Sequence, residues 1–328
     1  MSSGHRSVIA PLMLVLTTAF WSLSFPTMKA LSLAQQAVLP EASTWFLSSL
    51  CMVYRFGLAA LVMVLWCGRS LGGLTRLEVE EGVGLGVFAS IGLVLQMDGL
   101  AYTHASTSAF LTQCYCIIIP VWVAVVERRW PGPIVGVSCL LVVLGVAVLS
   151  RVDWREFTLG RGEIETILAS VVFTGQILWL QRPKYAPNRV NHFTAVMFAV
   201  ISLACVPPAV LTTARASDWV TAYAVPGAGL FLALLVVICT LGGYLLMNAW
   251  QPRVTATEAG LIYCAEPVFA SVLALFLPAW LSVVSGVAYA NERLTSSLLV
   301  GGGLITAANL LIHADRRRPA AAEPDRAQ

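Results

Sequence analysis

The sequence TATEAGLIYCAEP at residues 255–267 decides the fold, because it sets a carboxylate and a proline deep inside an apolar segment. Thr255 followed by Glu258 is the pattern of a capping box, which predicts that a helix begins there. At about 1.5 Å per residue, Glu266 lies roughly 16 Å further along that helix, half of a ~30 Å hydrocarbon core. We therefore expect Glu266 to lie near the middle of a membrane.

A carboxylate at that depth is costly when charged, so Glu266 should face a protein cavity, bind a proton or pair with a cation. Pro267 lacks an N–H group and therefore leaves the carbonyl of Tyr263 without its usual helical partner. Interrupted helices with free backbone groups near the midplane are typical of transporter binding sites. The two residues together predict a broken helix at a polar site.

The composition places the whole chain in the membrane class. Hydrophobic residues make up 58% and charged residues 11% of the 328 residues, with a mean hydropathy of +0.80. A net charge of +3 without a basic groove excludes nucleic acid as a partner. The eight cysteines lie almost all in apolar runs and form no CxxC pair, so we expect neither a metal site nor another cofactor.

Hydropathy predicts ten membrane spans in an all-α integral membrane fold. We expect the spans at residues 8–31, 45–67, 82–102, 105–126, 133–150, 163–181, 192–211, 228–250, 255–277 and 297–313. Segments on one side of this topology hold thirteen Lys and Arg residues, and those on the other side hold five. The charge bias predicts a multi-pass protein of a bacterial-type inner cell membrane with both termini in the cytoplasm. The charged, Pro- and Ala-rich composition of residues 314–328 predicts a disordered tail.

An internal repeat relates the two halves of the chain. Residues 90–111 match residues 240–261 at a spacing of 150, pairing Gly92 with Gly242 and Met97 with Met247. The repeat divides the chain into five-span halves at 8–150 and 163–313, joined by a loop at 151–162. Because five is odd, the second half should enter the membrane inverted relative to the first. The second half also carries about 15 extra residues at 278–292, either an extension of the ninth helix or a short surface helix.

Several short motifs give the chain a family resemblance. They are FWSLSFPTMKAL at 20–31, YRF at 54–56, THASTSAFL at 103–111, EPVFA at 266–270 and NERLT at 291–295. In this order the chain resembles the drug/metabolite transporter superfamily, in its EamA-like branch of ten helices. The resemblance implies transport of small organic metabolites or drugs, commonly outward, through a central cavity between two halves.

Polar and aromatic residues at the expected midplane are the candidates for that cavity. Glu266 could instead be a protonated structural carboxyl, and Arg55 either pairs with a substrate carboxylate or an acidic side chain or ties helices together. For the amide and aromatic candidates the alternative is ordinary helix packing. We expect helix breaks at Pro120 and Pro267, and the candidate site comprises Glu266, Tyr263, Gln113, Tyr115, Arg55, Gln176 and Trp21.

These features predict a secondary transporter that exports small amphipathic metabolites, such as amino acids, by alternating access. Proton coupling is one interpretation of Glu266, and uptake or facilitated diffusion is the alternative direction. A passive channel or scaffold fits the asymmetric carboxylate less well. An intramembrane enzyme is disfavoured because His5, His104, His192 and His313 all lie near span ends. The expected partners are a small-molecule substrate and the lipid bilayer, with the protein a monomer or a homodimer.

Overall fold

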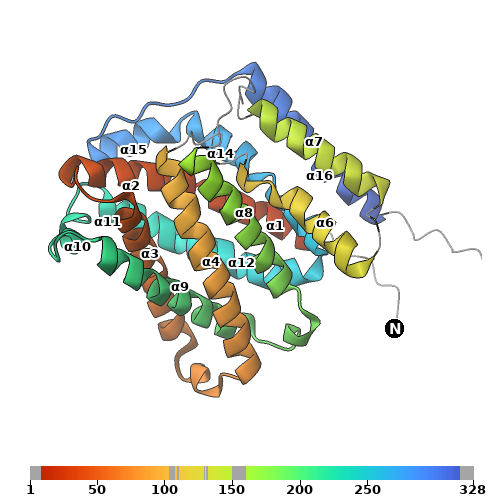
Figure 1. The fold of residues 1–328 in the computed structure, drawn as a ribbon, viewed down its shortest axis with the longest axis horizontal. Coiled ribbons are helices and arrows are strands. Elements are labelled where there is room, and N and C mark those ends of the chain that lie inside the picture. Colours follow the sequence, from red (N-terminus) through yellow and green to blue (C-terminus); the bar gives the residue numbers. More distant parts are fainter. Residues whose placement is uncertain are drawn as a thin grey trace, which may run out of the picture.

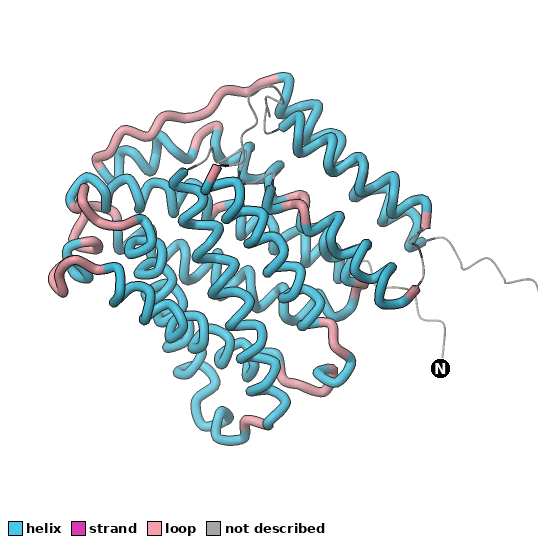
Figure 2. Tube along the Cα trace, viewed as in Figure 1, coloured by secondary structure: helices cyan, strands magenta, loops and turns pink. Residues whose placement is uncertain are grey.

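The computed structural model describes residues 9–102, 108, 111–128, 130, 132–149 and 160–317. Within those residues every regular element is a helix, which agrees with the expected all-α class (Figures 1 and 2). The helices of the first half are α1 (Ile9–Ser22), α2 (Ser24–Val38), α3 (Thr44–Cys67), η1 (Gly68–Gly73), α4 (Arg76–Tyr102), α6 (Tyr115–Glu127) and α7 (Pro133–Leu149).

The second half continues with shorter and more interrupted helices. They are α8 (Arg161–Leu180), η2 (Pro183–Tyr185), α9 (Val190–Thr212), α10 (Asp218–Thr221), α11 (Ala228–Leu234), the π-helix η3 (Leu235–Gly242), α12 (Gly243–Trp250), η4 (Gln251–Arg253), α13 (Ala256–Tyr263), α14 (Glu266–Ala274), α15 (Leu277–Ser285) and α16 (Ser296–Arg317). The helix α16 continues past residue 313, so the first residues of the predicted tail are helical and residues 318–328 lie outside the described part.

The long helices identify a multi-pass membrane protein. Six helical segments of the described chain are long and apolar enough to cross a membrane, and a bent pair formed by Ala256–Ala274 and Leu277–Ser285 brings the number to seven. Three further apolar helices, including Pro133–Val148, are shorter. Helices coincide with all ten predicted positions where residues are described, but the ten-span topology stays a prediction.

The core lies where α4 packs against α8 and α9, and α3 packs along α9. Glycine makes the closest of these crossings possible. A Cβ atom on Gly86 would lie 2.6 Å from the Val200 side chain, and one on Gly82 would lie 2.6 Å from the Phe193 carbonyl oxygen. The pair α7 and α16 runs side by side at one edge of the molecule (Figure 1).

The predicted capping box opens α13. The Thr255 hydroxyl accepts a hydrogen bond from the Glu258 amide at 3.2 Å, and the Glu258 carboxylate accepts one from the Thr255 amide at 2.9 Å. The helix then ends at Tyr263 and resumes at Glu266, with Pro267 in the first turn of α14. A proline is tolerated there because the first turn has no helical acceptor for its N–H group.

The structure differs from expectation at Pro120. This proline lies inside α6, and the interruption comes earlier, at residues 113–114. A single proline removes one helical hydrogen bond, and the helix can continue when another donor replaces it. The Cys139 thiol does so by donating to the Cys116 carbonyl at 3.3 Å. The interruptions at 113–114 and 264–265 occupy matching positions of the sequence repeat to within one residue.

The extra residues of the second half form the short helix α15, which bends by 63° from the preceding helical segment and packs on α2. The segment that follows folds back onto the end of α14. The Glu292 amide donates to the Ala274 carbonyl and the Ala279 amide to the Asn291 side chain, both at 2.8 Å. Residues 277–285 therefore form a short helix of their own and do not extend the ninth helix in a straight line.

Candidate functional site

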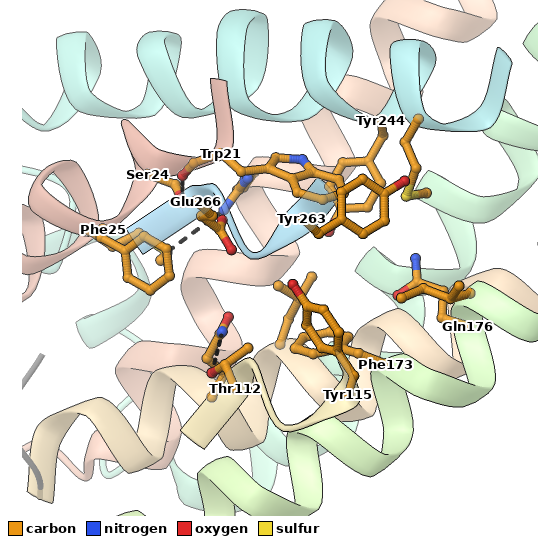
Figure 3. Close-up of a pocket in the computed structure, with 16 residues that line it drawn as sticks. Trp21, Ser24, Phe25, Thr112, Tyr115, Phe173, Gln176, Tyr244, Tyr263 and Glu266 are labelled. Carbon is orange, nitrogen blue, oxygen red and sulfur yellow. Dashed lines mark hydrogen bonds between the residues drawn. The ribbon is translucent and has the colours of Figure 1, made fainter. Parts of the chain in front are cut away.

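A cavity lies where the helix interruptions meet. It measures about 650 Å³ with its open mouth included, and residues of α1, α2, α3, α4, α6, α8, α12, α13 and α14 line it (Figure 3). The Ser22 hydroxyl donates to the carbonyl oxygen of Glu266 at 2.8 Å, which joins the α1/α2 break to the α13/α14 break. Both halves of the chain therefore contribute to one space.

The structure brings most of the candidate residues together. Those that line the cavity are Glu266, Tyr263, Tyr115, Arg55, Gln176 and Trp21. Gln113 is not among the lining residues. It lies at the interruption before α6, and its side chain is hydrogen-bonded to the Glu266 carboxylate. The roles of these residues stay predictions.

Glu266 begins α14 and is buried, with 8% of its surface exposed. Its carboxylate takes part in no ion pair within the described part of the chain. A buried carboxylate needs hydrogen bonds, a proton or a cation. Because the Gln113 amide satisfies it only in part, Glu266 has bonding capacity left for whatever occupies the cavity.

Arg55 is the buried cation of the same cavity, with 2% of its surface exposed. Its Nε donates to the Thr240 hydroxyl at 2.6 Å, and a terminal nitrogen lies 3.7 Å from the Met28 sulfur. Thr240 belongs to the π-helix η3, a form of helix that is frequent at functional sites. Arg55 thus ties α3 to η3 and also carries a charge that no described carboxylate neutralises.

Aromatic rings form much of the remaining wall. The Trp21 ring lies 5.4 Å from the Tyr244 ring and 5.3 Å from the Tyr263 ring, in tilted contacts. The Trp21 indole N–H is buried and has no hydrogen-bond partner among the described residues. Phe173 lies across the space from Trp21, and Phe25 lies to one side, near Glu266 (Figure 3). Such rings can pack against an apolar group or hold a cation over their faces.

The sequence did not single out several cavity residues as site candidates, including Phe25, Phe173, Tyr244, Thr112 and Ser24. Their types gave little signal, because an aromatic or hydroxyl residue in a membrane helix packs as readily against a neighbouring helix. Helical spacing could have found some of them. Leu93 and Gln96 on α4 and Tyr244 and Met247 on α12 are pairs three residues apart that share one helix face.

Charged clusters join helices at both ends of α4. At its last turns, Asp98 is fully buried and pairs with Arg161 of α8 at 2.5 Å. At its first turn, Glu78 pairs with Arg189 at 2.7 Å. That hydrogen bond raises the pKa of the Arg189 guanidinium. Each cluster links α4 to the second half of the chain.

Comparison with known proteins gives a distant relative and a common fold. No family model matches the chain. The chain is 24% identical, over 271 residues, to an uncharacterized transporter of Archaeoglobus fulgidus, a match that covers 82% of this chain and 78% of the relative. A protein of known crystal structure superposes with a TM-score of 0.66 at 16% identity, covering 95% of this chain and 99% of that one. The second similarity concerns the fold alone.

Proposed function

We propose that this protein is a secondary transporter of small zwitterionic organic metabolites, such as amino acids and related compounds. The observation that carries the proposal is that Arg55 and Glu266, two buried groups able to carry opposite charges, line one cavity without pairing to each other. The transporter relative and the apolar helices support the same class of function.

The charges argue for the class of substrate. A buried charge without a counter-charge is unfavourable. A ligand that supplies the counter-charge removes that cost and therefore binds more tightly. A zwitterion can supply a carboxylate to Arg55 and an ammonium group to Glu266 at the same time. The rings of Trp21, Tyr244 and Phe173 would then hold its apolar part.

The wider architecture is part of this proposal. The matching helix interruptions, the repeat and the sequence motifs support two inverted five-helix halves at 8–150 and 163–313, as in the EamA-like branch of the drug/metabolite transporters. The charge bias supports an inner cell membrane with both termini cytoplasmic. Export by alternating access follows from the resemblance, and Glu266 is the group through which a proton could be exchanged for the substrate.

Transport by purified protein in lipid vesicles tests the proposal. We expect vesicles to accumulate amino acids with free amino and carboxyl groups, and to move their methyl esters and N-acetyl derivatives at least about tenfold more slowly, because each derivative leaves one buried charge unpaired. Arg55→Gln and Glu266→Gln should each lose at least about tenfold of the zwitterion rate.

Matched controls are available at exposed positions. Arg215 and Glu41 lie outside the cavity on the surface, so Arg215→Gln and Glu41→Gln should keep the parental rate. Movement of esters and N-acetyl compounds at the zwitterion rate, or no movement of any of these solutes with or without a proton gradient, would contradict the proposed substrate class.

A further inference from the structure

A second hollow lies on the other side of the cavity wall. This groove of about 2360 Å³, measured with its open mouth, runs between α6, α8 and the turn from η4 to α13. Its walls are apolar along α6 and α8, and its polar end includes Arg182 and Thr257. The packing explains why it exists, because α8 is held closely by α4 and only loosely by α6.

The groove and the cavity share two helices as their partition. On α8, Gln176 and Ile177 line the cavity, while Leu178 and Gln181, the residue just after the helix, line the groove. On α13, Tyr263 lines the cavity, and Ala256 at the other end of the helix lines the groove. A small separation of α8 from α13 would therefore join the two spaces.

Gln251 closes this partition with a continuous set of hydrogen bonds. Its side chain is completely buried, donates to the Ile177 carbonyl at 2.9 Å and accepts from the Tyr263 hydroxyl at 2.8 Å. Gln181 donates to the Gln251 carbonyl at 3.4 Å and to the Val254 carbonyl at 2.9 Å. The bonds thus run from cavity residues to groove residues through one glutamine.

We infer that Gln251 is the gating residue between the cavity and the groove, and that the groove is the path by which solutes reach the cavity from that face. The inference rests on the proposed transport function and adds a residue and a route to it. Gln251 begins η4, a helix of three residues within the connection between α12 and α13, so a change in this short element alters both bonds of its side chain. Buried polar networks favour two discrete arrangements, fully bonded or separated.

The cavity has another neighbour on the opposite side. A hollow of about 530 Å³, measured with its open mouth, extends from Met28 towards Thr44 and Leu100, and Met28 lines both spaces. The described structure therefore places the central cavity between two hollows, with the Gln251 network on the groove side. Breaking the hydrogen bonds of this network would connect the groove to the cavity, as alternating access requires on one side at a time.

Side-specific thiol labelling tests this inference. The reporter is Ser24→Cys, a substitution in the cavity wall, in a background whose eight native cysteines are replaced. A membrane-impermeant maleimide is applied from the face that carries the Arg253 turn. We expect Gln251→Leu, which removes both side-chain bonds at similar volume, to raise the labelling rate from that face at least about fivefold, because the network no longer holds α8 to α13.

Two further variants make the result specific. Tyr263→Phe removes only the hydroxyl, so it should also raise the labelling rate from the Arg253 face. If Gln251→Leu does not fold, this variant alone tests the inference. Asn248→Leu is the matched control, because Asn248 is a buried amide on α12 that donates to Thr194 of α9 at 2.8 Å, away from the partition. It should leave labelling from the Arg253 face unchanged.

Equal labelling of the parent and both partition variants, or an equal rise in Asn248→Leu, would overturn the gating role. The labelling needs no substrate, so it separates this inference from the proposed function. A change in labelling without any zwitterion transport would contradict only the substrate class. Zwitterion transport without a change in labelling would contradict only the gate.

Discussion

Glu266 reaches the cavity because the helix is interrupted at residues 264–265 and resumes with Glu266 as the first residue of α14. Its depth in the membrane stays a prediction from counting residues along the helix. Arg55 was harder to interpret from the sequence, because a buried arginine serves equally well as a structural tie or as a ligand group. The Thr240 bond shows the tie, and because no carboxylate of the described residues pairs with Arg55, the second role is open to substrate.

The first prediction at this scale concerns coupling. Glu266→Gln keeps the shape of the side chain and removes its ability to exchange a proton. If Glu266 exchanges a proton for the substrate, transport by this variant should no longer respond to an imposed pH gradient, while the parental rate changes several-fold with it. Counterflow of labelled substrate at equal pH on both sides measures the residual rate without a proton gradient.

The control for this prediction is Gln113→Leu, which leaves the carboxylate in place and removes its neighbouring amide. It should keep the response to the pH gradient and shift the pH at which the response appears. A Glu266→Gln variant with an unchanged rate and an unchanged pH response would show that the carboxylate has no part in coupling.

At the scale of the helices, close packing depends on glycine. Gly86→Ala would place a Cβ atom 2.6 Å from the Val200 side chain and 3.0 Å from the Met197 carbonyl, so α4 and α9 would have to move apart. We expect a loss of about 1–3 kcal/mol in the free energy of unfolding, the usual cost of overpacking. Thermal or detergent-induced unfolding of the purified protein in micelles measures it.

The matched control is Gly136→Ala on α7, where no atom lies within 4 Å of the added Cβ. This variant should be neutral or slightly more stable, since alanine favours the helix over glycine. Equal destabilisation of the two variants would mean that the α4–α9 crossing does not depend on the absence of a side chain.

The helices also show how far the sequence could predict the structure. Hydropathy predicted the helix positions and the Thr255–Glu258 pair predicted the start of α13, because both signals are local. The π-helix η3 and the continuous path of α6 through Pro120 could not be predicted, since each depends on partners from other helices: Arg55 for Thr240, and Cys139 for Cys116. Cavity aromatics such as Phe173 were missed because their composition does not distinguish a cavity wall from a helix contact.

At the scale of the whole molecule, α4 joins the two halves at both of its ends. Asp98 pairs with Arg161 at one end, and Glu78 pairs with Arg189 at the other. In alternating access one end separates while the other stays closed, so the two ion pairs should favour opposite conformations. The Gln251 network lies on the same side as the Glu78 end, because α4 begins and α8 ends there.

We therefore expect the loss of each ion pair to shift the conformational equilibrium in the opposite direction to the loss of the other. With the thiol introduced by Ser24→Cys as the reporter, Glu78→Gln should speed labelling from the Arg189 face and slow it from the other face, and Asp98→Asn should have the reverse effect. A lost pair worth about 1.4 kcal/mol shifts such an equilibrium about tenfold. Arg69→Gln, which changes an exposed arginine of η1, should have neither effect. Labelling that rises from both faces in both variants would indicate general loosening of the fold, whereas opposite shifts are what two closures acting on one central cavity require.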